Sequence, residues 1–293
     1  MATSINPSQL LSRVFAPIQH EYGLRDTQLY ALGIGLGANP LDARQLRFVY
    51  EGAGGDCLLV MPTMVNILGY PGFWAREADA CIDWRRLVHA EQHIELHAAL
   101  PPQGKVVSLN RIKALWDRGP QKGAFLQQQR LIHDAGSGSL LATVTQLSLL
   151  RGDGGFGAGG TEGQAPTAHK MPERPADHVW DQATSHQAAL LYRLSGDVNP
   201  LHADPEIARA AGFQRPILHG MATMGFAAHA VLRTLLGYDP RRLKAMRVRF
   251  TAPALPGDTL RTELWVDGQV VSLRTTAVER EIIVLDNARV DMN

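Results

Sequence analysis

The sequence predicts an α+β fold in which a central helix is followed by a meandering antiparallel sheet, and in which this plan occurs twice. Three observations predict it: alternating apolar and polar runs, one long apolar segment, and short motifs that recur in the same order in both halves of the 293-residue chain. Each half has helical segments followed by strand-like runs, so we expect two copies of one unit.

The second half shows the plan most clearly. A helical segment covers residues 185–194, and a short helix starts after Asp204, where a capping carboxylate precedes a proline. A long apolar helix is predicted over 220–236, and Gly237 ends it. It is apolar on nearly all sides, as expected of a helix surrounded by a sheet. Strands are predicted over residues 245–251, 259–266, 270–278 and 281–290.

The first half contains a shorter helical segment over about 63–68 and strands near Ala90, Val106 and Leu140. Between the halves, residues 151–175 are rich in Gly and Pro and poor in large apolar residues. Such a composition is typical of a linker. We therefore predict an N-terminal repeat over 1–150, a linker over 151–175 and a C-terminal repeat over 176–293.

Three short motifs support a duplication. They lie in the same order in both halves, and the first two are offset by nearly the same number of residues. The pairs are 29–32 with 191–194, 39–43 with 199–203, and 99–101 with 254–256.

Composition excludes several classes of partner. The chain carries 29 basic and 28 acidic residues, a net charge of +1, so neither nucleic acid nor an anionic membrane is expected as a partner. No run of apolar residues is long enough to span a bilayer, and the N-terminus does not resemble a signal peptide. With two cysteines and no peroxisomal signal at the C-terminus, we expect a cytoplasmic protein.

The densest polar cluster lies between residues 192 and 202. Gly196 and Pro200 force a turn, which can direct Asp197, Asn199 and His202 toward one point. Loops held by a rigid scaffold are where reactive groups usually lie. The alternative is that Asp197 and Asn199 only make side-chain turns and that His202 covers a helix end. Spacing alone leaves both interpretations open.

His219 and Gly220 stand at the start of the long apolar helix. Glycine lets a ligand approach the backbone, and the amides of a helix N-terminus stabilise negative charge. An acid/base pair beside such a site suits addition or proton abstraction next to a carbonyl. The alternative is that Gly220 only relieves crowding where the helix packs against the sheet.

The loop from Tyr192 to His202, with Gly220 downstream, resembles the (R)-specific 2-enoyl-CoA hydratases, or hydratase 2, within the MaoC-like dehydratases. This resemblance implies a double hot-dog fold, in which each repeat wraps a sheet around a long helix. Further segments resemble the hydratase domain of multifunctional peroxisomal β-oxidation enzymes: 29–33, 48–51, 89–92, 154–157 and 248–250.

The resemblance implies a role for each residue of the loop. Asp197 and His202 form the catalytic pair that holds the reactive water, Asn199 orients the site, and the Gly220 amide receives the thioester oxygen. The implied reaction is reversible syn hydration of a trans-2-enoyl-CoA to an (R)-3-hydroxyacyl-CoA. Glu51 matches a further family carboxylate, although it could equally cap a strand end.

The family pattern also implies contacts with CoA. It usually has Gly where this chain has Ala90 and Lys where it has Arg118, so one close backbone contact is lost and one cation changes its geometry. The first repeat lacks the Asp/His pair, so we expect it to be non-catalytic and to hold the acyl tail and CoA. The implied CoA-binding residues outside the catalytic set are His89, Ala90, Arg118, Pro200, Leu201 and Phe250.

No metal or cofactor is expected beyond the CoA of the substrate. Three His residues are spaced four apart over 89–97, but the alternation of polar and apolar residues favours a strand over a zinc-binding helix. The glycines of 152–157 match a dinucleotide fingerprint without its strand and helix.

A homodimer is expected by analogy. The alternatives are a hot-dog acyl-CoA thioesterase and a non-catalytic acyl-CoA-binding protein.

Overall fold

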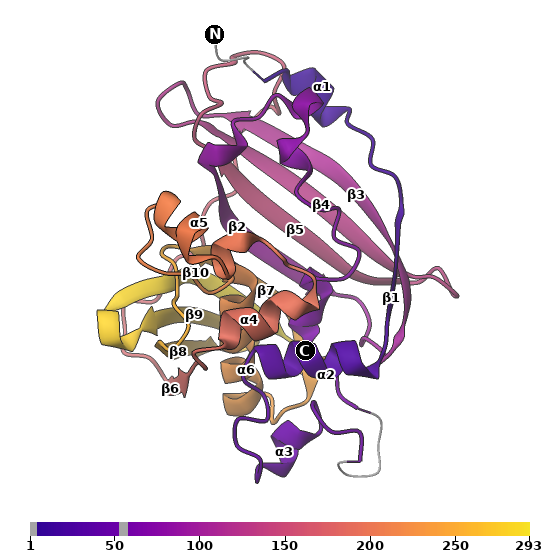
Figure 1. Ribbon diagram of the computed structural model, residues 1–293, viewed down its shortest axis with the longest axis vertical. Helices are drawn as coiled ribbons and strands as arrows, with labels where there is room; N and C mark the ends of the chain where they lie inside the picture. Colours follow the sequence, from indigo (N-terminus) through magenta and orange to yellow (C-terminus); the bar gives the residue numbers. More distant parts are fainter. Residues whose placement is uncertain (1–4, 53–57) are drawn as a thin grey trace.

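The computed structural model describes residues 5–52 and 58–293 and confirms the α+β class. Its described strands form one antiparallel sheet with the order β1-β3-β4-β5-β2-β7-β10-β9-β8-β6. Strands of the first half therefore lie together on one side and strands of the second half on the other (Figure 1).

Over its described residues, the first half contributes five strands and three short α-helices. Its strands are β1 (Ile18–Tyr22), β2 (Leu87–Leu96), β3 (Gly104–Asp117), β4 (Ala124–Asp134) and β5 (Leu140–Leu150), and its helices are α1 (Pro7–Leu11), α2 (Leu24–Gly33) and α3 (Ala43–Leu46). The strands expected near Ala90, Val106 and Leu140 are all present, and β4 was not predicted.

The second half contains the predicted long helix and all four predicted strands. Its elements are β6 (His178–Ala183), α4 (Ala188–Tyr192), α5 (Pro205–Ala210), α6 (Gly220–Thr234), β7 (Leu243–Phe250), β8 (Thr259–Asp267), β9 (Val270–Ala277) and β10 (Ile282–Met292). The Asp204 side chain caps α5 as expected, accepting hydrogen bonds from the amides of Glu206 and Ile207. Within the described ranges, no helix combines the length and apolar character needed to cross a membrane.

The expectation of a long central helix in each repeat is wrong for the first repeat. The segment at the position of α6 is only a five-residue 3₁₀ helix, η2 (Pro62–Asn66). The buried Arg130 guanidinium donates to the Val65 and Asn66 carbonyls at 3.3 and 2.7 Å, which satisfies carbonyls that the end of a helix leaves without a partner. Gly69, with φ of +58°, then turns the chain away.

The two halves are joined at the seam between β2 and β7. Glu91 of β2 lies opposite Arg249, and its buried carboxylate accepts hydrogen bonds from the Nε atoms of Arg247 and Arg249 at 2.8 and 2.9 Å. A buried carboxylate must be paired, and here it is paired only when β2 and β7 adopt this register. This ion-pair cluster therefore fixes the register in which the sheets of the two repeats are joined.

A common hydrophobic core lies behind the sheet and includes residues of both halves. Helix α6 approaches the end of α2 so closely that a Cβ on Gly225 would lie 2.5 Å from Cγ2 of Ile34. Helices α2 and α4 lie side by side, with the Tyr30 and Tyr192 ring centroids 5.8 Å apart (Figure 1). The repeated Leu-Tyr motifs of the sequence thus pack against each other.

Residues 151–175 contain no helix or strand, and the domain boundaries drawn there stay a prediction. The start of the segment is anchored by Asp117 at the end of β3, whose carboxylate accepts the amides of Gly155 and Gly157, each at 2.7 Å. The glycine amides of the formal dinucleotide fingerprint therefore bind a side chain of the protein itself.

We predict that Gly225→Ala destabilises the fold despite the better helix propensity of alanine. The added methyl would collide with Ile34, and overpacking of this kind costs about 1–3 kcal/mol. Chemical denaturation measures the free energy of unfolding. Ile34→Ala should relieve the collision, so the double variant should lose less than the sum of the two single losses. Strict additivity would contradict the contact.

Candidate active site

The predicted catalytic loop connects α4 to α5 and contains a tight turn. Gly196 adopts φ of +111°, and the Asn199 side chain accepts the Leu201 amide at 3.1 Å, which begins a short 3₁₀ helix over Pro200–His202. The Asp197 carboxylate accepts the Asn199 amide at 3.3 Å. The side-chain turns considered as the alternative interpretation are therefore present, and they shape the loop rather than replace its polar cluster.

His202 is buried at the end of this turn, and its orientation is fixed. Its Nδ1 lies 2.9 Å from the Ile217 carbonyl, which can only accept, so Nδ1 carries the proton and Nε2 keeps its lone pair. Burial lowers the pKa of His202, so the ring is neutral at pH 7. A neutral imidazole with a free nitrogen can act as a base.

Gly220 is the first residue of α6, where the amides of the first turn have no partner within the helix. A Cβ at this position would lie 3.1 Å from the Phe250 ring, so a larger residue would push Phe250 of β7 aside. The helix is fifteen residues long, and its dipole adds to the positive potential at this end. The position suits an oxyanion.

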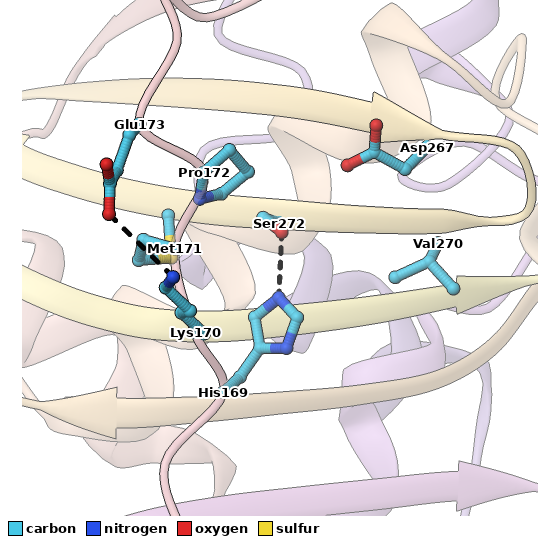
Figure 2. A pocket seen from close by; sticks show the side chains of 8 residues that line it. All are labelled: His169, Lys170, Met171, Pro172, Glu173, Asp267, Val270 and Ser272. Atoms are coloured by element: carbon cyan, nitrogen blue, oxygen red, sulfur yellow. Dashed lines mark hydrogen bonds and ion pairs between the residues drawn. The ribbon is translucent and has the colours of Figure 1, made fainter.

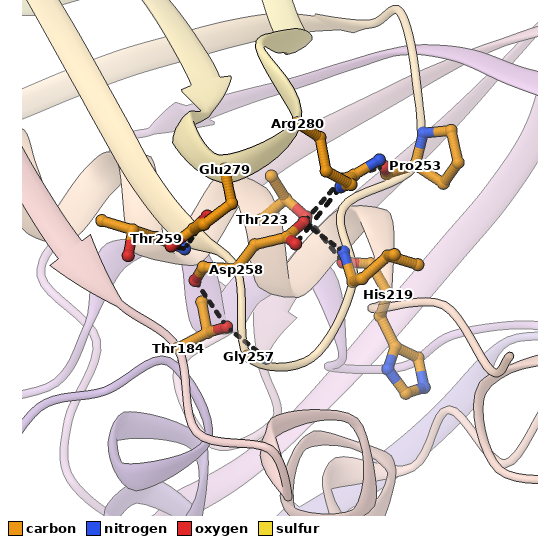
Figure 3. A network of polar contacts seen from close by, with 10 residues as sticks. Thr184, His219, Thr223, Pro253, Gly257, Asp258, Thr259, Glu279 and Arg280 are labelled. Carbon is orange, nitrogen blue, oxygen red and sulfur yellow. Dashed lines mark hydrogen bonds and ion pairs between the residues drawn. The ribbon is translucent and has the colours of Figure 1, made fainter.

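The N-terminus of α6 is held by a polar network around the loop before β8. The Leu218 amide donates to the Ala254 carbonyl at 2.8 Å, and the buried Asp258 binds Arg280 and the Leu255 amide. Figure 3 shows the part of this network around Asp258 and Arg280, together with the His219 ring, which points away from it. The network thus positions the start of α6 without using the imidazole.

The first repeat reaches the site through His89 of β2. Its ring packs edge-on against Phe250 with centroids 5.0 Å apart, and its Nε2 lies 3.0 Å from Oε1 of Gln92. Burial lowers the pKa of His89 to about 4, while Asp197 is close enough to raise it in part. Ala90 follows at a bulge in the pairing of β2 with β5. The seam between the repeats therefore borders the site.

Asp197, His202 and His219 come together in three dimensions. Each offers a ligand atom, and these atoms lie within 4.8 Å of one another. The rings of His202 and His219 are stacked, however, with centroids 3.7 Å apart and planes at 27°. Lone pairs in nearly parallel planes do not converge on one point as a tetrahedral metal requires. The arrangement suits acid/base chemistry.

Three predicted residues do not bring their side chains into this cluster. Arg118 is exposed at the end of β3, with its guanidinium 4.3 Å from the centroid of the Phe125 ring. Glu51 is exposed after α3 and accepts a hydrogen bond from Gln28 at 2.6 Å. Asn199 is exposed and uses its side-chain oxygen within the turn. Their predicted roles remain predictions.

His219 was not predicted as a site residue. It is 1% exposed, and its Nε2 lies 3.1 Å from the Asp197 carbonyl. Its place directly before Gly220 was the available signal, but only folding reveals that its ring stacks on His202.

The first repeat contains the same turn with different chemistry. The Asn39 side chain accepts the Leu41 amide at 3.1 Å, just as Asn199 accepts the Leu201 amide. Where His202 follows in the second repeat, the first has Asp42, which caps α3 through the Arg44 amide. One copy of the turn therefore presents an imidazole, and the other starts a helix.

A shallow open depression lies elsewhere on the surface. Residues of the connecting segment cross β8 and β9 there, with His169 Nε2 2.7 Å from Ser272 Oγ (Figure 2). None of the predicted site residues lines it.

Two family models match the chain in succession. Residues 20–152 match the MFE-2 hydratase 2 N-terminal domain, and residues 167–288 match the MaoC like domain. The chain is 37% identical over 305 residues to a protein of Arabidopsis thaliana named "Enoyl-CoA hydratase 2, peroxisomal", with 97% of this chain and 96% of the relative covered.

The chain belongs to the enoyl-CoA hydratase 2 family. Among solved structures, a MaoC-like dehydratase from Phytophthora capsici has a TM-score of 0.86 at 30% identity, with 99% of both chains covered. A Mycobacterium tuberculosis protein described as having a double hot-dog fold has a TM-score of 0.56 at 18% identity, with 96% of this chain and 95% of that chain covered. The predicted fold and family are thereby confirmed.

Because several histidines are buried, we predict that the protein loses stability in acid. Burial is the main cause that lowers the pKa to about 4 in His89 and His219 and to about 3 in His229, against an ordinary value of 6.5. The unfolded chain therefore takes up protons below pH 6.5 that the folded chain cannot, and the free energy of unfolding falls as the pH drops toward these values.

Denaturant titrations at pH 7 and pH 5 measure this fall. The control is His229→Phe, which removes one of these groups and should show a smaller difference between the two pH values. Equal stability of the unchanged protein at both pH values would contradict the prediction.

Proposed function

We propose that this protein catalyses the reversible hydration of a trans-2-enoyl-CoA to an (R)-3-hydroxyacyl-CoA. The observation that carries the proposal is the convergence of the Asp197 carboxylate and the His202 imidazole beside the first turn of α6. Membership of the hydratase 2 family supplies the class of reaction, and the site supplies groups for each of its steps.

A water molecule between Asp197 and His202 is the nucleophile. The free Nε2 of His202 and the carboxylate can both accept from that water, since the two side chains bring a ring nitrogen and a carboxylate oxygen within 4.8 Å of each other. As the water oxygen bonds to C3 of the enoyl group, one water proton passes to the Asp197/His202 pair, and the pair returns a proton to C2, so that H and OH are added across the double bond. Addition from one side gives the syn product, because both groups belong to the same short loop.

The Gly220 amide stabilises the charge that develops on the thioester oxygen. Attack at C3 moves electron density to that oxygen, so a donor there binds the transition state more strongly than the substrate. One such donor contributes about 3 kcal/mol. The position of Gly220 at the start of α6 supports this role, because the helix dipole acts in the same direction.

CoA and the acyl tail extend toward the first repeat in this proposal. His89 and Ala90 lie at the seam between the repeats, where His89 packs against Phe250 and Phe250 lies next to Gly220, while Pro200 and Leu201 belong to the short helix that ends at His202. Arg118 provides a cation for phosphate farther along the first repeat. The short η2 covers less of the first repeat's sheet than α6 covers of the second, which favours placing the tail there.

Several properties remain predictions. These are the need for no cofactor beyond CoA, the contribution of Glu51, the homodimer, the absence of nucleic-acid and membrane partners, and the cytoplasmic location. The Arabidopsis relative is named as peroxisomal, so the location needs its own experiment.

We predict that Asp197→Asn and His202→Gln each lower kcat with crotonyl-CoA by at least about 100-fold while the fold is retained. Each variant keeps the size of the side chain but removes a proton carrier, and general acid/base groups contribute factors of about 10² to 10⁴. The loss of enoyl-thioester absorbance measures hydration, and circular dichroism checks the fold. Near-normal rates in either variant would remove that residue from the mechanism.

A thiol reagent in the same assay separates hydration from thioester hydrolysis. Loss of the enoyl band without free CoA supports the hydratase, whereas release of CoA would indicate a thioesterase. Binding of the acyl-CoA with no change in absorbance would indicate a non-catalytic binding protein.

The product should have the (R) configuration at C3. Chiral chromatography of the hydrolysed 3-hydroxy acid measures it directly. An (S) product would require that water reach the opposite face of the double bond, and it would contradict the proposed placement of the substrate.

A further inference from the structure

His219 is a buried titratable residue that the proposed mechanism does not use. It is 1% exposed and stands directly before Gly220, as the N-cap of α6. Its Nδ1 is buried and has no hydrogen-bond partner within the described ranges. A buried imidazole needs an explanation, since an apolar ring would fill the same space without an unpaired nitrogen.

The side chain contacts both members of the proposed catalytic pair. Its Nε2 lies 3.1 Å from the Asp197 carbonyl, which can only accept, so Nε2 carries the proton and donates. One face of the ring stacks on His202 at 3.7 Å, and the Tyr192 ring lies 5.0 Å away. His219 therefore fixes the main chain of one reactive residue and the ring of the other.

The backbone of His219 is held independently of its ring. The His219 carbonyl accepts the Thr223 amide at 3.0 Å and the Thr223 hydroxyl at 3.2 Å, as part of the first turn of α6 (Figure 3). The adjacent Leu218 amide is bound to Ala254. Changing the side chain therefore leaves the anchors of the helix start in place.

The surroundings keep His219 neutral during turnover. Burial, the neighbouring His202 and Arg193 together lower its pKa to about 4, and Asp197 opposes them only in part. When His202 accepts a proton, its stacked neighbour cannot take a second one without strong repulsion. The pair therefore carries at most one positive charge near neutral pH, and that charge belongs to His202.

We propose that His219 is a positioning residue of the hydration reaction, which holds the Asp197 main chain and the His202 ring face to face as a neutral support. The inference rests on the proposed function, because it assigns to Asp197 and His202 the roles given there. In this proposal His219 acts through these two residues, because its Nε2 proton is committed to the Asp197 carbonyl.

Three variants separate the two contacts. His219→Gln keeps a donor for the Asp197 carbonyl and loses the stacked ring, His219→Phe keeps a stacked ring and loses the donor, and His219→Ala loses both. We expect His219→Ala to lower kcat with crotonyl-CoA by about 100-fold or more, with KM changed less than about threefold. The Gln and Phe variants should each recover part of that loss.

His229→Phe is the matched control. His229 is another buried histidine of α6, but it hydrogen-bonds to Tyr238 and packs against Trp180 instead of the catalytic loop. We expect its kcat to stay within about twofold of the unchanged protein. This control separates the position of His219 from the general effect of removing a buried imidazole.

The outcomes distinguish this inference from the function on which it rests. Wild-type hydration with kcat unchanged in the Gln and Phe variants would overturn the positioning role alone, even if His219→Ala fails to fold. A rise in KM with unchanged kcat would also overturn it, because a positioning role acts on the reaction step. No hydration by the unchanged protein would overturn the proposed function and this inference together.

Discussion

The pairing of β2 with β7 is the constraint on which the rest of the structure depends. It joins the strands of the two repeats into a single sheet. Glu91 fixes the register of this pairing, because a shifted register would separate its buried carboxylate from at least one of the two guanidiniums that bind it. The same seam brings His89 of the first repeat to Phe250 of the second. The site is therefore bordered by both repeats, although its proposed reactive groups belong to one.

The two repeats show how one turn can be used for different purposes. Asn39 and Asn199 make the same hydrogen bond to the amide two residues later, so the backbone of the turn is the same in both. Three residues after each Asn, Asp42 caps a helix and His202 faces a carboxylate. The scaffold is duplicated, and the chemistry of the site is set by the residue that the turn presents.

Much of the second repeat could be predicted from its sequence because its local signals agree with its tertiary structure. Alternation gave the strands β7 to β10, and the apolar run ended by Gly237 gave α6. The first repeat was harder to predict, because contacts distant in sequence decide it. Arg130 satisfies the carbonyls at the end of η2, and β4 was missed because its central glutamines do not alternate with apolar residues. The Gln128 side chain accepts a hydrogen bond from the Trp74 indole, a contact distant in sequence.

In the candidate site, too, the features set by local sequence were predicted and those set by tertiary contacts were not. Spacing predicted that Asp197 and His202 share a loop and that Gly220 starts a helix, since these are local properties of the chain. The stacking of His219 on His202 joins residues seventeen positions apart across the α5 turn, and no periodic pattern encodes it. Arg118 and Glu51 were carried over from the family pattern, and neither lies in the central cluster.

The anchoring of the connecting segment has an electrostatic consequence for the neighbouring cation. The Asp117 carboxylate accepts the amides of Gly119, Gly155 and Gly157, so its oxygens are occupied by the backbone, and among the described residues no ion pair joins it to the adjacent Arg118. Arg118 accordingly keeps its attraction for anions in solution. At physiological ionic strength this attraction extends about 8 Å, far enough to draw in a phosphate group before any direct contact is made.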